Sequence, residues 1–262
     1  MRCRVRFRSL LVGVAATAIL FPSLARAGNG AVPSLKANSV PNNSVPNNIV
    51  IGFVGGFVHS DNQHHGPVQL AERIQKDSPQ GTFVRVFENR RRRQARQLID
   101  RLLGADRNGV LSAEEKTRAH IILFGHSWGA AAAVLLARDL RQQGIPVALT
   151  VQVDSVAKLW QNDTVIPDNV EEAVNFYQTQ GFVHGRRLIK AEDPEKTQIL
   201  GNYLVDYRKN RVQCPEASWW DRIFTPGHMQ SECDPRLWSN IEGIVRERIA
   251  AGATAKITAM GR

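Results

Sequence analysis

The residues with the clearest chemical potential form a Gly-x-Ser-x-Gly motif, which reads Gly-His-Ser-Trp-Gly at residues 125–129. Four apolar residues, 121–124, precede the motif and alanines follow it, which is the order of a buried strand, a sharp turn and a helix. In this context the turn lifts a serine hydroxyl into an exposed position where it can attack a substrate. Gly125 and Gly129 would let the strand and the helix pass close together. A tight turn without a chemical role is the alternative, but the flanking pattern favours a nucleophile at Ser127.

A serine hydroxyl becomes a strong nucleophile only when a base accepts its proton and a third group orients that base. An acid is therefore expected after the serine, at the end of a neighbouring strand. Asp154 directly follows the strand predicted over 147–153, so it would lie at the same sheet edge as Ser127. Asp206, after a later extended stretch, is the reserve candidate. Asp154 could instead cap the segment that follows it.

The chain offers seven histidines for the role of the base. His228 is the first candidate because it lies in a predicted loop just before the last predicted helix, where a base that follows the acid is expected. His184 is the second candidate, and an exposed loop position without a role is the alternative for His228. His126 lies inside the motif, and we expect its side chain to point at the sheet.

The oxyanion that forms when a serine attacks a carbonyl group needs two hydrogen-bond donors. The backbone N–H of Trp128, directly after the candidate nucleophile, is the first. The second is expected from the turn at residues 55–57, where two glycines let the backbone approach a ligand closely, so that Phe57 or Gly56 donates. Glycines at the end of a strand also fit an ordinary turn.

These side chains need a sheet whose strands end at one edge, and the remaining pattern predicts such a sheet. Apolar runs predict strands over 49–54, 82–87, 119–124 and 147–153, with an extended stretch at 198–207. Helical spacing predicts helices over 66–77, 91–103, 128–143, 168–180 and 234–251. Strands that alternate with helices predict the α/β class, with a mostly parallel central sheet and helices on both faces. We expect one domain over 49–262.

The first 48 residues do not belong to this predicted domain. A basic start and an apolar stretch, 10–24, precede Ala25-Arg26-Ala27, which together are typical of a secretory signal peptide over 1–27 cleaved after Ala27. Residues 28–48 repeat Ser-Val-Pro-Asn-Asn and predict a flexible linker. The sequence thus predicts a secreted or periplasmic protein with no integral membrane segment in its mature chain.

Removal of the leader changes the charge of the chain. The whole chain has a formal net charge of +10, and five arginines but no acidic residue lie in the leader, so +5 remains. This excess is too small to favour nucleic acid as the partner. The arginine run at 90–93 opens a predicted helix, and we interpret it as a solvated helix face.

Two cysteines, Cys214 and Cys233, remain after removal of the leader. In an oxidising compartment a disulfide between them is expected, and it would stabilise the fold by up to about 3 kcal/mol. The disulfide would also brace the loop that carries His228.

A segment between the second predicted helix and the strand at 119–124 resembles a calcium-binding loop. With Gly109 at the turn, oxygen ligands would come from Asp106, Asn108, Ser112 and Glu115. The position of the first ligand is Gly104, which has no side-chain oxygen. We favour the alternative, in which Ser112 caps a helix and Glu115 completes a capping box, so that no cofactor is expected.

The chain resembles the α/β-hydrolase superfamily in its motif at 125–129, its glycine turn at 55–57, Asp154 and His228. Within that superfamily the pattern is nearest to secreted lipases and esterases, although Val54 stands where a histidine is common before the glycine turn. The resemblance implies a serine hydrolase that cleaves a carboxylic ester of a small molecule or lipid through Ser127, His228 and Asp154. Only the motif around Ser127 is specific.

Two alternative hypotheses assign the protein to another functional class than an ester hydrolase. An acyltransferase would use the same triad and is separated from a hydrolase by supplying an alcohol acceptor. A non-catalytic protein that binds an envelope or another surface would keep the scaffold, and it would not react with a serine-directed phosphonate.

Overall fold

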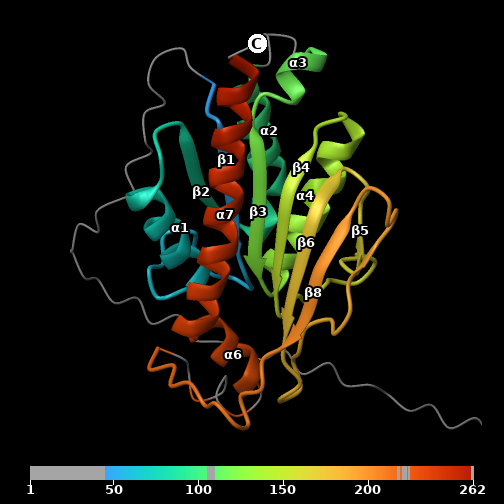
Figure 1. Ribbon diagram of the computed structural model, residues 1–262. Helices are drawn as coiled ribbons and strands as arrows, with labels where there is room; N and C mark the ends of the chain where they lie inside the picture. The colour runs from blue at the N-terminus through green and yellow to red at the C-terminus, as the bar shows by residue number, and fades with distance from the viewer. Residues whose placement is uncertain (1–44, 105–109, 217–218, 220–222, 224, 261–262) are drawn as a thin grey trace, which may run out of the picture. The chain divides into compact units, whose positions relative to one another are not determined.

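The computed structural model describes residues 45–104, 110–216, 219, 223 and 225–260, with side chains to residue 253 (Figure 1). The predicted signal peptide and most of the predicted linker lie outside the described residues. Among the described helices, none combines the length and the apolar character that a membrane span requires.

The core of the fold is a six-stranded sheet in which every pair of neighbouring strands is parallel. Its strands are β1 (Asn48–Val54), β2 (Thr82–Glu88), β3 (His120–His126), β4 (Val147–Val153), β6 (Val170–Tyr177) and β8 (Gln198–Leu204). They lie in the order β2-β1-β3-β4-β6-β8, and a separate parallel pair joins β5 (Val165–Ile166) to β7 (Lys190–Ala191). The central strands β1 and β4 are buried along their whole length, as expected for a parallel sheet covered on both faces.

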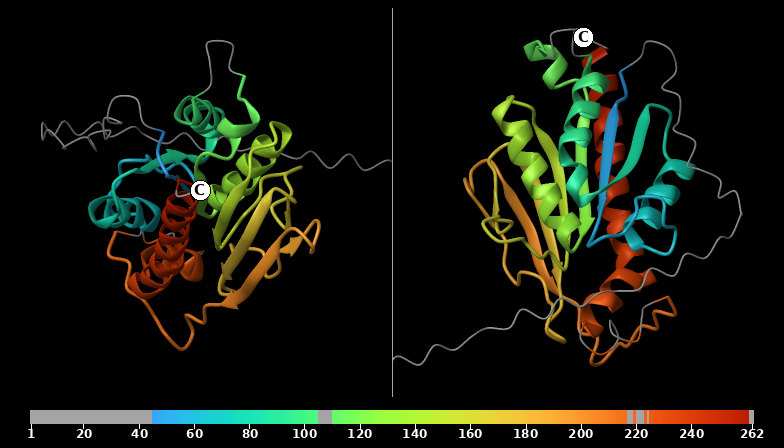
Figure 2. Two further views of the ribbon diagram at one scale, coloured as in Figure 1. Left: turned by 45° about the horizontal axis from the view of Figure 1, so that its top comes forward. Right: turned by 180° about the vertical axis from the view of Figure 1, so that it is seen from behind.

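Helices cover the two faces of this sheet, as predicted. Helices α1 (Gly66–Asp77) and α7 (Pro235–Met260) pack on one face, and α2 (Arg92–Leu103) and α4 (Trp128–Gln142) pack on the other. Figure 1 shows α7 in front of the sheet, and the view from behind in Figure 2 shows α2 and α4. Short elements complete the described fold: η1 (Asn89–Arg91), α3 (Ala113–Lys116) and α6 (Pro226–Cys233).

Side chains of β1 alternate between the two helical layers because successive residues of a strand point to opposite faces. Ile49, Ile51 and Phe53 pack with α2 and α4, whereas Val50 and Val54 pack with α1 and α7. The strand begins at Asn48, so the last residue of the predicted linker belongs to the sheet.

One predicted element is wrong. The helix expected over 168–180 is instead strand β6, which pairs with β4 on one side and β8 on the other. Apolar residues in this segment fit helical spacing, but buried Val174 and Phe176 pack with the α1 and α7 layer while Ala173 packs with the α2 and α4 layer. Strand pairing and burial on both faces therefore override the local pattern. The last predicted helix is also longer than expected and reaches Met260.

The order of the strands creates a switch point between β1 and β3. From β1 the chain continues outward to β2, and it then returns to β3 on the other side of β1. In open parallel sheets, ligands bind beyond the carboxyl ends of the strands at such a point. Residues 55–57 follow β1 and Ser127 follows β3, so the topology brings both segments to this position.

Candidate active site

Ser127 occupies a strained turn between β3 and α4. Its φ of 56° and ψ of −126° lie outside the regions that non-glycine residues usually adopt. Such strain is typical of functional positions that the surrounding structure enforces. The turn is fixed on both sides, since the Ser127 N–H donates to the Val153 carbonyl at 3.0 Å and its own carbonyl accepts from Ala130 N at 3.0 Å.

The two glycines of the motif permit this close turn, as the sequence predicts. A Cβ on Gly125 would lie 2.4 Å from the carbonyl carbon of Gly129, and a Cβ on Gly129 would lie 2.3 Å from the Phe53 oxygen. Both distances are too short for any side chain. Strand β3, helix α4 and strand β1 therefore meet at backbone distance around Ser127.

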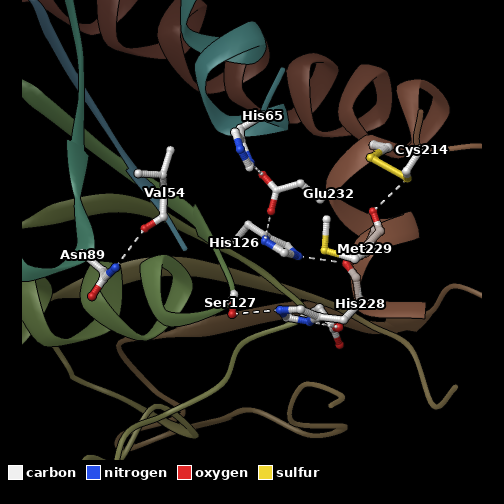
Figure 3. A network of polar contacts seen from close by, with 12 residues as sticks. Val54, His65, Asn89, His126, Ser127, Cys214, His228, Met229 and Glu232 are labelled. Atoms are coloured by element: carbon white, nitrogen blue, oxygen red, sulfur yellow. Dashed lines mark hydrogen bonds and ion pairs between the residues drawn. A yellow bond between two sulfur atoms is a disulfide. The ribbon is translucent and has the colours of Figure 1, made fainter. Parts of the chain in front are cut away.

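The structure brings Ser127, His228 and Asp154 together in one hydrogen-bonded chain (Figure 3). His228 Nε2 lies 2.9 Å from Ser127 Oγ, and His228 Nδ1 lies 2.6 Å from Asp154 Oδ2. All three residues are buried, with Ser127 at 8% and His228 at 9% exposure. Because Asp154 accepts from Nδ1–H, Nε2 is free to accept the hydroxyl proton of Ser127.

Asp154 is held by donors from the segment between β6 and β7 as well as by His228. Its Oδ2 accepts from Gln178 Nε2 at 2.7 Å, and its Oδ1 accepts from Gly185 N at 2.6 Å. Burial would raise the pKa of Asp154, but the hydrogen bond and charge of His228, with the Gln178 amide, hold its pKa below the ordinary value. Sequence reasoning missed Gln178 and Gly185 because they follow β6, the strand that was expected to be a helix.

His228 lies in helix α6 and not in a loop, which corrects the sequence prediction. Pro226 starts this helix in the first-turn position that proline favours. The helix ends at Cys233, which forms a disulfide with Cys214 as predicted, with Cα atoms 5.7 Å apart. The element that carries His228 is therefore both helical and covalently anchored.

The reserve candidates lie elsewhere. His184 is exposed. Asp206 caps a turn by accepting from Arg208 N at 3.0 Å, and its carboxylate lies 3.9 Å from Lys209 Nζ. Neither residue joins the hydrogen-bonded chain of Ser127.

The residues expected to hold an oxyanion flank Ser127. Trp128 is the first residue of α4, where a backbone N–H has no partner within the helix. The turn at 55–58 abuts the nucleophile, since a Cβ on Gly55 would lie 2.8 Å from Ser127 Cβ. Gly56 has a φ of +46°, and the exposed ring of Phe57 lies edge-on to Trp128 with ring centroids 5.5 Å apart.

Asn89, which sequence reasoning did not single out, anchors this turn from the end of β2. Its Nδ2 donates to the Gly56 carbonyl at 2.6 Å, and its Oδ1 accepts from Lys158 Nζ at 3.0 Å. The Lys158 ammonium in turn lies 4.6 Å from the centre of the Trp128 ring. The two segments expected to donate to an oxyanion are thus linked through Asn89 and Lys158.

A second buried ionic cluster adjoins His228. The Nδ1 of His126 forms an ion pair with Glu232, and the other oxygen of Glu232 lies 2.9 Å from His65 Nδ1. The His126 ring packs on the His228 ring with centroids 4.6 Å apart and a tilt of 34°. The side chain of His126 therefore leaves the sheet and meets α6, and Figure 3 shows it between Glu232 and His228.

The charges of this cluster stabilise each other. Burial would lower the pKa of His126, but the charge and hydrogen bond of Glu232 raise it above its ordinary value. Burial would likewise raise the pKa of Glu232, but His126, together with His65, holds it far below its ordinary value. Sequence reasoning missed this pair because it singled out no acidic residue near His228.

Neither group of candidate metal ligands fits a metal well. Ligand atoms of His126, Asp154 and His228 lie within 4.8 Å of one another, but each side chain already has an ionic or hydrogen-bond partner. In the predicted calcium loop, Asp106 and Asn108 lie outside the described residues. Ser112 and Glu115 form the capping box expected as the alternative, with Glu115 N donating to Ser112 Oγ at 3.2 Å.

The arginine run at 90–93 is only partly a solvated face. Arg91 pairs with Glu88 at 2.7 Å and Arg92 pairs with Asp139 at 2.7 Å. Arg90 and Arg93 are exposed and line a groove of about 570 Å³ together with Lys158.

Apolar side chains are exposed in the loops beyond the strand ends. Trp160 is 97% exposed and Phe57 is 82% exposed, and Trp219 is exposed as well. Trp160 and Trp219 are thus surface residues and not core residues, whereas Trp220 and Phe224 lie outside the described residues.

Comparisons with known proteins found matches among solved structures at low sequence identity. No family model and no curated protein sequence matches it. Solved structures that match the chain include a novel cutinase-like protein from Cryptococcus sp., at 14% identity and a TM-score of 0.31, where the match covers 48% of this chain and 62% of that one. Another is RedJ with a PEG molecule bound in its active site, at 10% identity and a TM-score of 0.34, covering 64% of this chain and 87% of that one.

Proposed function

We propose that the protein is an exported serine hydrolase that cleaves a carboxylic ester. The observation that carries this proposal is the hydrogen-bonded chain from Ser127 Oγ through His228 to Asp154, at the carboxyl edge of the sheet. The same geometry would serve acyl transfer to an alcohol, but no feature of the described residues favours an acceptor other than water. A surface-binding protein would have no use for a strained serine beside a buried base.

The reaction follows from these positions. Ser127 Oγ attacks the carbonyl carbon of the ester while its proton moves to His228 Nε2. Asp154 accepts from Nδ1–H and stabilises the positive charge on the imidazole ring. The N–H groups of Trp128 and of Phe57 or Gly56 stabilise the negative charge on the carbonyl oxygen.

The second half of the reaction restores the enzyme. The tetrahedral intermediate collapses, the bond to the alcohol oxygen breaks, and His228 gives its proton to the departing alcohol. His228 then takes a proton from water, whose oxygen attacks the acyl carbon, and Ser127 leaves with that proton as the acid is released.

Export rests on the predicted leader, and the Cys214–Cys233 disulfide is typical of oxidising compartments. The proposal predicts that the secreted protein starts at Gly28. Recovery of only a full-length, intracellular chain would contradict it.

The activity is tested with p-nitrophenyl butyrate and a fluorophosphonate probe. We expect ester turnover and a single covalent adduct, which peptide mass spectrometry locates at Ser127. Ser127→Ala should abolish both, whereas Ser112→Ala, which alters an exposed capping serine, should keep both. Equal turnover and labelling in the Ser127→Ala protein would overturn the mechanism.

A further inference from the structure

The His126 ring lies where it can act on His228 without touching the substrate. It is 2% exposed, and both of its ring nitrogens have identified partners. Nδ1 faces Glu232, and Nε2 lies 3.0 Å from Ser231 Oγ. Neither partner belongs to the chain that connects Ser127 to Asp154.

The hydrogen bonds around His126 define its protonation. Ser231 Oγ donates its only proton to the His228 carbonyl oxygen at 2.7 Å, because a carbonyl can only accept. Ser231 Oγ can therefore only accept from His126, so Nε2 carries a proton. Nδ1 faces a carboxylate and carries a proton as well, which makes the ring an imidazolium cation.

This cation is also mechanically connected to His228. It reaches the His228 backbone through Ser231, and its ring packs on the His228 ring at 4.6 Å. Trp238 fixes the same end of α6, since its Nε1 donates to the Glu232 carbonyl at 2.9 Å. The end of α6 is thus held from β3 and from α7.

We propose that His126 and Glu232 form a charged brace that positions His228 and opposes the build-up of a second positive charge on its ring. This inference rests on the proposed function, and it assigns His126, Ser231 and Glu232 as positioning residues for the base. The brace makes His228 harder to protonate, so the enzyme keeps a neutral base at lower pH. It would extend activity toward acidic conditions.

The other titratable groups around the His126 and His228 rings do not supply a second cation in contact with His228. Asp154 faces both rings from the end of β4, and His65 contacts Glu232 from the start of α1. From the segment after β8, Tyr207 lies near Asp154 and Asp234, and burial raises its pKa, so it stays neutral. Arg236 pairs with Asp234 at 3.5 Å and is itself exposed. Among the described residues, His126 is the cation in ring contact with His228.

The first test measures kcat/KM against pH, whose acidic limb reports the base of the free enzyme. Glu232→Gln removes the acid but offers an amide N–H to Nδ1 of a neutral His126, so the hydrogen bonds persist while the charge is lost. We expect the acidic limb to move upward by about one pH unit. His65→Asn, which removes the other contact of Glu232 and keeps a good helix N-cap, should leave the limb in place. An unmoved limb in a folded Glu232→Gln protein would overturn the proposal.

The second test needs neither a variant of Glu232 nor enzymatic activity. In the full chain labelled with ¹⁵N-histidine and carrying Ser127→Ala, nitrogen chemical shifts should show both ring nitrogens of His126 protonated at pH 6.5, where a free histidine is half deprotonated. An unprotonated ring nitrogen at that pH would refute the brace. Absence of ester turnover in the wild type, with both nitrogens protonated, would instead refute the proposed function alone.

Discussion

The molecule contains two buried histidines, each between a carboxylate and a serine, and the difference between them lies in the serine. His228 lies between Asp154 and Ser127, and His126 lies between Glu232 and Ser231. In the proposed mechanism, Ser127 keeps its proton available for His228, and that ring accepts it as the base. Ser231 has already given its proton to a carbonyl, so the His126 ring must donate and is a cation. The same three residue types thus produce a base in one place and a fixed charge in the other.

The largest expected effect comes from exchanging the carboxylate of the catalytic set. Asp154→Asn should lower kcat by about 10⁴, because an amide in place of the carboxylate favours the wrong tautomer of His228. Glu232→Gln should change the plateau value of kcat by less than about tenfold, because Glu232 does not touch the reacting atoms. Steady-state kinetics with p-nitrophenyl butyrate measure both variants. Equal losses of kcat in the two variants would mean that Asp154 and Glu232 do not differ in role.

A smaller effect is expected on stability, with a defined pH dependence. The pKa of Glu232 is held below its ordinary value of 4.5, so its contribution is present above pH 4.5 and is lost as the pH falls. The pKa of His126 is raised above 6.5, so its contribution is present below pH 6.5 and is lost as the pH rises through the raised value. The pair of Glu232 and His126 therefore stabilises the fold most between pH 4.5 and pH 6.5.

Glu232→Gln should accordingly lower Tm on the order of 5 °C between pH 4.5 and 6.5, and by less on either side of this window. Scanning calorimetry of wild type and variant across pH 3–9 measures the difference. A Tm difference that is independent of pH would show that Glu232 and His126 are not charged in the folded protein.

The smallest effect is expected from Ser231, which links the brace to the His228 carbonyl. Ser231→Ala removes the link between His126 and the His228 carbonyl but keeps the charge, so kcat should fall about three- to tenfold while the acidic limb stays in place. Thr197→Val, which removes a buried hydroxyl just before β8, is the matched control and should leave kcat unchanged. A shifted limb in Ser231→Ala would mean that Ser231, and not the charge, sets the pH range.

The sequence allowed good prediction of the first half of the fold, because its strands and helices follow local patterns. The expected order of serine, acid and histidine also selected three side chains that meet in the structure, although their catalytic roles stay predictions. The helix at 66–77 and the strand at 147–153 have the predicted bounds. His228 contacts both Asp154 and Ser127, as expected. Beyond residue 160, tertiary pairing decides the structure, so β6 was mistaken for a helix and Gln178 was missed.

The brace could not have been predicted from the chain. No motif in the sequence links His126 to Glu232, and glutamate is mostly exposed in folded proteins. Only the packing of α6 against the end of β3 brings them together, and burial then makes their charges depend on each other. Helix α6 itself is short, and its apolar pattern is weak.

The packing of His126 has a consequence for engineering. The motif Gly-x-Ser-x-Gly leaves the residue before the serine unspecified. In this protein, a grafted motif without histidine would leave the acid at position 232 without its buried counter-ion. The five-residue motif and the last turn of α6 therefore form one transferable unit, and a successful chimera must carry both.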